Sequence, residues 1–156
     1  MTLRPANYKY QRYEDISLSA IGPVYADIEL LNFDDLVLNQ SGFLPPTGIR
    51  AIRRQALSNS GEMELVINQE IKELLDLPVR EERTVRLADE SLQRVEIVGP
   101  VEVRFENRST IVTAIVVSDA EEILLGRIPL GGLGVFIDPE SKQLVVIPDR
   151  PIKRVA

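Results

Sequence analysis

Residues that could do chemistry are few in type, because the 156-residue chain contains neither histidine nor cysteine. Their absence excludes disulfides, thiol nucleophiles, zinc sites of the usual Cys/His kind and every Ser-His or Cys-His triad. Acid–base chemistry would therefore have to come from Asp, Glu, Lys or Tyr. The sequence indicates no metal site and no cofactor. Its Gly-rich stretch 129-PLGGLG-134 lacks the Lys-Ser/Thr pair and the following helix of a phosphate-binding loop.

One stretch sets a polar residue where chemistry is often found. In 55-QALSNSGEMELVINQEIKELLDLP-78 an apolar strand runs into the turn Asn59-Ser60-Gly61, and a short amphipathic helix follows. Many proteins hold a catalytic carboxylate at the apex of such a strand, turn and helix, but the residue here is an amide. In isolation, Asn-Ser-Gly is an ordinary turn signal far more often than the remnant of an active site.

Length and composition predict one domain with a packed core, since 44% of the residues are hydrophobic and 27% are charged. We interpret residues 1–22, which are polar and rich in tyrosine, as an N-terminal arm that is either mobile or laid over another surface. The domain is expected to span residues 23–149. Residues 150–156 then form a polar C-terminal tail.

The elements that would position the turn are mostly strands. Residues 24–30 alternate apolar and polar side chains, and residues 49–57 form a second strand that leads into the turn. Between them, at residues 32–48, we predict a loop or hairpin tip, because Pro45-Pro46 and Gly48 are incompatible with a central strand.

Residues 68–78 form the one predicted helix. Asn68 can cap its start, and Pro78 prevents its continuation. Its predicted apolar face consists of Ile71, Leu74 and Leu75.

Hairpins account for most of the remaining chain. They are predicted at residues 83–98, with Asp89-Glu90 at or near the tip, at residues 100–117 and at residues 135–147. An apolar strand that ends at Gly126 lies between the last two. The predicted fold is all-β with one short helix, as a small closed antiparallel β-barrel.

Four features stand in one order along residues 24–148. They are the Asn59-Ser60-Gly61 turn, the hairpin 88-ADES-91, the strand 99-GPVEVRFENR-108, and 123-ILLG-126 followed by 128-IPL-130. This order resembles the single-domain, retropepsin-like aspartic peptidases, and in particular the small bacterial and archaeal members of that family.

The resemblance implies a retropepsin-like homodimer with one site at its two-fold axis. It assigns the catalytic turn to Asn59, Ser60 and Gly61. It assigns substrate binding to Glu62, Ala88, Asp89, Glu90 and Ile128. It assigns a structural role, as the second glycine element, to Leu124, Leu125 and Gly126.

The chain departs from the family pattern where the chemistry would sit. Asn59 occupies the position of the catalytic Asp, Glu62 replaces a small residue, and Glu90 replaces the glycine of the flap hairpin. In the family two aspartates share a proton, so that one activates water while the other polarises the peptide carbonyl. Two asparagines could hydrogen-bond across the axis, but they could not accept that proton at any ordinary pH.

We therefore expect a catalytically silent homodimer that binds an extended polypeptide segment or acts as a scaffold. The alternative is an aspartic endopeptidase in which Asn59 is a laboratory replacement of the catalytic Asp, or in which Glu62 takes over its role. Three unusual residues around one site favour natural loss of catalysis over one engineered change, and strand alternation should point Glu62 away from the axis. A third interpretation is a β-rich structural domain of a larger complex.

The charge of the chain bears on its partners and location. The net charge of −6 argues against a general nucleic-acid binder, which usually carries a basic face. The sequence contains no apolar run of the length that a signal peptide or a membrane span needs. We expect a cytoplasmic protein without a nucleic-acid or membrane partner.

Overall fold

The computed structural model describes residues 22–148 of the chain. The arm predicted for residues 1–22 lies outside this range except for Gly22, and the tail predicted for residues 150–156 lies wholly outside it.

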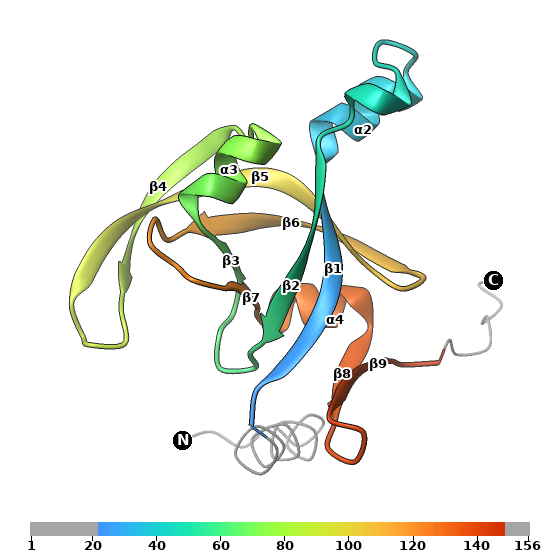
Figure 1. Ribbon diagram of the computed structural model, residues 1–156. Helices are drawn as coiled ribbons and strands as arrows, with labels where there is room; N and C mark the ends of the chain where they lie inside the picture. The colour runs from blue at the N-terminus through green and yellow to red at the C-terminus, as the bar shows by residue number, and fades with distance from the viewer. Residues whose placement is uncertain (1–21, 149–156) are drawn as a thin grey trace, which may run out of the picture.

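A closed barrel of six strands forms the body of the molecule (Figure 1). Its hydrogen-bonded strands follow the order β1-β2-β7-β3-β6-β5, and β5 pairs again with β1. Strand β4 extends the sheet beyond β5, while β8 and β9 form a separate hairpin. The strands are β1 (Val24–Asn32), β2 (Ala51–Ser58), β3 (Leu65–Ile67), β4 (Val79–Arg86), β5 (Leu92–Phe105), β6 (Arg108–Val116), β7 (Ile123–Leu125), β8 (Val135–Asp138) and β9 (Gln143–Val146).

The barrel is a mixed sheet, which corrects the expectation of a purely antiparallel one. Strand β2 runs parallel to β7, and β3 runs parallel to β6, whereas the other pairs are antiparallel. Both parallel pairs join strands that are distant in sequence: β7 inserts between β2 and β3, and β6 lies on the other side of β3. Alternation along one segment indicates a strand, but it contains no information about a neighbour so distant in sequence.

The predicted strand alternation is confirmed in β1. Val24, Ala26, Ile28 and Leu30 are buried, whereas Tyr25 on the opposite face is exposed. The buried set joins apolar side chains of the other barrel strands in one continuous core. Burial of each large aliphatic side chain contributes about 1.5–3 kcal/mol to folding, which makes this core the main source of stability.

The predicted helix exists as α3 (Gln69–Leu75). The Asn68 side-chain oxygen accepts a hydrogen bond from the Ile71 N–H at 3.0 Å, as a capping residue should. Ile71 and Leu75 are buried, but Leu74 is about half exposed, so its assignment to the apolar face was wrong. Positions four apart lie above one another on a helix, and this seven-residue helix buries only that pair.

Two further helices correct the expectation of a single one. The segment predicted as a loop contains α2 (Phe33–Gln40), capped by Asn32, and its prolines lie beyond the helix in the short 3-10 turn η1 (Pro46–Gly48). Helix α4 (Arg127–Leu133) was not predicted, because it contains Pro129 and two glycines. Proline is tolerated in the first turn of a helix, and the buried Leu130 and Leu133 hold α4 in place. Within residues 22–148 no helix has the length and apolar character needed to cross a lipid bilayer.

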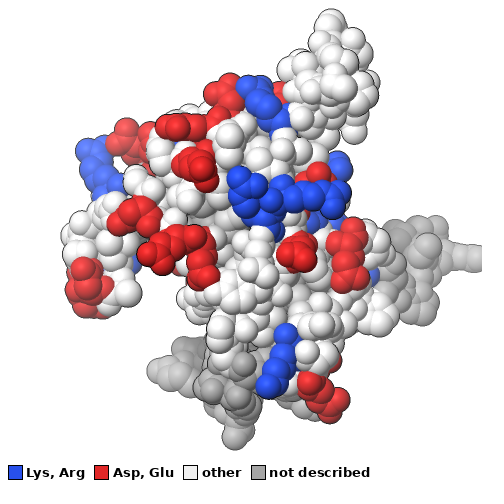
Figure 2. All heavy atoms as spheres, in the orientation of Figure 1, with Lys and Arg blue, Asp and Glu red and all other residues white. Residues whose placement is uncertain are grey.

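Residues 33–50 form a lobe that projects from the barrel (Figure 1). Residues 36–49 contain no charged side chain, and the lobe accordingly appears white at the upper right of Figure 2. Phe43 is 81% exposed. The outer part of the lobe, residues 36–49, is thus an uncharged projection from a protein in which about a quarter of the residues are charged.

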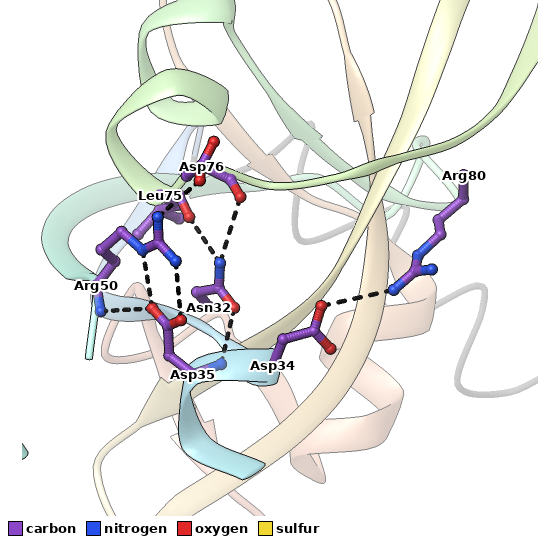
Figure 3. Close-up of polar contacts among 7 residues, drawn as sticks. All are labelled: Asn32, Asp34, Asp35, Arg50, Leu75, Asp76 and Arg80. Atoms are coloured by element: carbon purple, nitrogen blue, oxygen red, sulfur yellow. Dashed lines mark hydrogen bonds and ion pairs between the residues drawn. The ribbon is translucent and has the colours of Figure 1, made fainter. Parts of the chain in front are cut away.

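An ion pair between a buried carboxylate and a partly exposed arginine fixes the base of this lobe (Figure 3). The Asp35 carboxylate is 3% exposed and accepts two side-chain hydrogen bonds from Arg50, each of 2.9 Å, and one from the Arg50 backbone N–H at 3.0 Å. Arg50 also contacts Asp76 at 2.7 Å, beyond the end of α3. Asn32 donates to the Leu75 carbonyl at 2.8 Å. The hydrogen bonds from Arg50 lower the pKa of Asp35 below its ordinary value of 3.8.

We predict that Asp35→Asn lowers the free energy of unfolding by about 2–3 kcal/mol, because it removes the buried charged partner of Arg50 and leaves the guanidinium with the exposed Asp76. A lowered pKa means that the ionised form stabilises the fold above pH 3.8 and that this stabilisation is lost as the pH falls below that value. Urea unfolding of the variant should therefore depend less on pH below about pH 5 than that of the wild type. Asp27→Asn, at an exposed position outside the network, is the control; an equal loss in both variants would contradict the prediction.

Candidate functional site

Asn59 follows the last residue of β2 and is held by three hydrogen bonds. Its N–H donates to the Leu125 carbonyl of β7 at 2.9 Å, and its own carbonyl accepts from the Glu62 N–H at 3.1 Å. Its side-chain oxygen accepts from the Gly61 N–H at 2.9 Å. The side chain therefore closes its own turn through an acceptor that an aspartate would equally provide. Ser60 is buried, and Asn59 itself is partly exposed.

The carboxylates that follow the turn are engaged locally. One oxygen of Glu62 accepts hydrogen bonds from the N–H groups of Met63, at 3.0 Å, and Glu64, at 3.3 Å. The Glu64 carboxylate instead forms an ion pair of 2.8 Å with Arg83 of β4. Glu62 is thus folded back on the backbone of its own loop.

The chain after β7 lies against the loop of residues 59–64. Three backbone hydrogen bonds join them: Gly126 N–H to the Glu64 carbonyl at 3.1 Å, Arg127 N–H to the Glu62 carbonyl at 2.8 Å, and Ile128 N–H to the Met63 carbonyl at 2.8 Å. The approach is so close that a Cβ on Gly126 would lie 2.6 Å from backbone atoms of both Met63 and Glu64. Only glycine fits this crossing without a shift of the backbone.

The predicted flap is the tip of the β4–β5 hairpin. The Leu87 N–H donates to the Ser91 carbonyl at 2.8 Å, and Asp89 accepts from the Ser91 N–H at 3.0 Å and from its hydroxyl. These bonds from Ser91 lower the pKa of Asp89. Glu90 has a φ of 70°, in the left-handed region that favours glycine. A backbone that suits glycine thus carries a charged residue.

The structure brings together some of the predicted site residues and leaves others apart. The first glycine turn, Glu62, the second glycine element and Ile128 lie side by side through the hydrogen bonds given above. Ala88, Asp89 and Glu90 are exposed, and no hydrogen bond within the described chain connects them to that group. Figure 1 shows the loop after β2 and the hairpin tip extending toward the same side of the barrel.

Sequence reasoning missed the residues that connect the loop to the hairpin. Arg83 bonds Glu64 at 2.8 Å and Glu81 at 2.5 Å, which ties β4 to the loop of residues 59–64. No local pattern marks this contact, because Arg83 and Glu64 are two among many charged residues and their pairing depends on where β4 lies. Exposed Met63, beside Ile128, was also missed.

A hollow of about 690 Å³ lies elsewhere, on the outer side of β1, β2 and β5. Two long ion pairs lie in it, since Arg53 and Arg104 are 3.9 and 3.8 Å from the carboxylate of Glu29. Three arginines and three carboxylates line it, so their formal charges cancel: Arg53, Arg54, Arg104, Asp27, Glu29 and Glu106.

Comparison of the chain with known protein-family models and with curated proteins found no match. Within residues 22–148 no three Asp, Glu, His or Cys side chains converge as a metal site would require.

We predict that Gly126→Ala destabilises the protein by about 2–3 kcal/mol, because the added Cβ must displace backbone atoms of the loop of residues 59–64. Gly131→Ala in α4 is the matched control, since a Cβ there meets nothing within 4 Å. It should raise stability by up to about 1 kcal/mol through helix propensity. Chemical denaturation of both variants tests the contrast, and equal effects would refute the crossing constraint.

Proposed function

We propose that the chain forms a retropepsin-like homodimer that has no peptidase activity and binds an extended polypeptide segment, or serves as a scaffold, without cleaving it. The observation that carries this proposal is the carboxamide of Asn59 at the apex of the turn after β2, where the side-chain oxygen accepts the Gly61 N–H at 2.9 Å.

The chemistry of the amide explains the loss of activity. An aspartate dyad works because one carboxylate takes a proton from water while the other, protonated, polarises the peptide carbonyl. Asparagine keeps the shape of aspartate but has no site that is protonated at ordinary pH. Loss of acid–base assistance alone costs on the order of 10²–10⁴ in rate, and in a homodimer both members of the dyad are lost together.

The arrangement of the two glycine elements supports the retropepsin-like assignment. The resemblance rests on two motifs separated by more than sixty residues in sequence, 59-NSG-61 and 124-LLG-126. Their strands, β2 and β7, are parallel neighbours, and the Asn59 N–H donates to the Leu125 carbonyl. Motifs that carry a single family signature are expected to meet in this way.

Exposed apolar side chains beside the turn support a two-fold contact. Met63 is 45% exposed and Ile128 is 49% exposed, and the Ile128 N–H donates to the Met63 carbonyl at 2.8 Å. Apolar groups grouped on a surface are commonly covered by a partner, and a two-fold contact covers the same patch on both copies.

The edge of the sheet supports binding of an extended segment. Strand β4 pairs with β5 on one side only and is the last strand of the sheet, so the backbone N–H and C=O groups of its other edge have no strand partner within residues 22–148. An extended peptide can add to such an edge through main-chain hydrogen bonds.

The alternative is an aspartic endopeptidase that lacks its acid only because Asn59 replaces it. It is favoured by the Asn59–Gly61 hydrogen bond, which a carboxylate could make with little change in the turn. The variant in which Glu62 acts instead has less support, since that carboxylate already accepts two backbone N–H groups.

Asn59→Asp separates these proposals. We expect the wild type to leave a casein-type substrate intact between about pH 3 and pH 7. The Asp variant should remain folded and also inactive, because Glu62 and Glu90 remodel the site as well. Cleavage by the variant alone, with an acid optimum and inhibition by a statine-type compound, would favour the endopeptidase. Cleavage by the wild type would overturn the proposal, and Glu62→Gln would then test the remaining acid.

The oligomeric state tests the dimer. Light scattering coupled to size-exclusion chromatography should give the wild type twice its chain mass of 17.5 kDa. Ile128→Asp and Met63→Asp should each shift the protein toward the monomer, because a buried unpaired carboxylate disfavours an interface. Phe43→Asp, at the 81% exposed position on the remote lobe, is the control and should leave the mass unchanged. A monomeric wild type would contradict the dimer.

A further inference from the structure

We infer that the extended segment bound by this site is basic, with apolar side chains that alternate with lysine or arginine. This inference rests on the proposed function, because it specifies the extended segment that is bound; the surface concerned is the outer face of β7, β2 and β1 rather than the free edge of β4. Two independent features carry it: an apolar row across the six barrel strands, and the distribution of charge on the loops that flank this row.

The outer apolar row follows from the strand registers. Residues of one parity on these strands, such as Leu65, Ala114 and Leu125, are fully buried in the main core, so their neighbours face the other side of the sheet. Each of those neighbours is the register partner of the next one on the adjacent strand, and together they form a row around the barrel. All are apolar or aromatic: Ile97, Ile115, Val66, Leu124, Leu57 and Tyr25.

The row is covered at one end and open at the other. Ile97 and Ile115 are packed with Val95 in a second, small cluster. Leu57 and Leu124 are only partly buried, and Tyr25 is 41% exposed. The open end offers apolar contact to side chains that project from one face of an extended peptide, at every second position.

The loops on either side of the row are acidic. Leu124 is the central residue of three-residue β7, so the loop of residues 59–64 and the start of α4 lie beyond one end of this strand, and residues 117–122 lie at the other end. These flanking segments contain one arginine, Arg127. They contain five carboxylates: Glu62, Glu64, Asp119, Glu121 and Glu122.

Most of this negative charge is not neutralised within the described chain. Of the five carboxylates, only Glu64 forms an ion pair within residues 22–148, with Arg83. Glu122 instead accepts a hydrogen bond from the Tyr25 hydroxyl at the open end of the row. The flanking segments hold a net charge of −4, compared with −6 for the whole chain.

This arrangement selects the ligand by charge as well as by shape. Single exposed charge pairs contribute little, but several carboxylates around one groove attract cations, speed their association and repel acidic segments. When every second side chain of a partner enters the row, the intervening side chains project from the opposite face of the peptide. Lysine and arginine are long enough to bend back and bring their charged ends to the flanking carboxylates.

Four labelled ten-residue peptides and the full-length protein test the inference by fluorescence anisotropy. Valine alternates with lysine in the first, with glutamate in the second and with serine in the third; the fourth alternates serine with lysine. We expect the valine–lysine peptide to bind at least about tenfold more tightly than the valine–glutamate peptide at low salt, with a smaller difference at high salt.

The outcomes separate the inference from the proposed function. Equal binding of the three valine peptides would overturn the basic preference and leave the peptide-binding site standing, and the absence of binding by all four would overturn both. Binding of the serine–lysine peptide as tightly as the valine–lysine peptide would reveal a general charge effect and would overturn the role of the apolar row.

A double variant locates the charge effect. Asp119→Asn with Glu121→Gln should weaken binding of the valine–lysine peptide about three- to tenfold at low salt. The control is Asp27→Asn with Glu140→Gln, which removes two exposed carboxylates outside the flanking segments. Equal weakening in the two double variants would show that net charge, rather than its placement, governs binding.

Discussion

The close crossing of two chain segments at Gly126 is the constraint on which the rest of the site depends. The backbone after β7 forms three hydrogen bonds with the loop of residues 59–64, at a separation that leaves no room for a side chain on Gly126. The crossing places β7 between β2 and β3, and the barrel then closes through β5 and β1. It also sets the position of Asn59, whose N–H donates to β7.

The polar groups around this crossing are placed so that local bonds use most of them. Asn59 closes its own turn, Glu62 accepts from its own loop, and Glu64 connects that loop to Arg83 of the hairpin. A site arranged in this way holds its shape without a shared proton. We therefore propose that the features needed for binding remain although the acid needed for hydrolysis is absent, and that the surrounding negative charge determines which segments bind.

Particular residues show which parts of the structure could be predicted from local sequence patterns. The alternation in β1, the Asn68 cap of α3 and the turn at Asp89-Glu90 are short-range features, and all three were predicted. Helix α2 was missed because Pro45-Pro46 was taken as a sign of loop throughout, although the helix ends before these prolines. Helix α4 was missed because burial of Leu130 and Leu133 outweighs the poor helix propensity of its glycines.

The sequence by itself determined the chemical limits of the protein: without histidine or cysteine, and with asparagine at the turn, no usual nucleophile or acid pair is available there. It also determined most strands, because burial alternates with a period of two. Only the tertiary structure decided that β2 and β7 run parallel, that Arg83 meets Glu64, and that five carboxylates flank one apolar row. Those relations join residues far apart in the chain, and strand order, which no local pattern contains, brings them together.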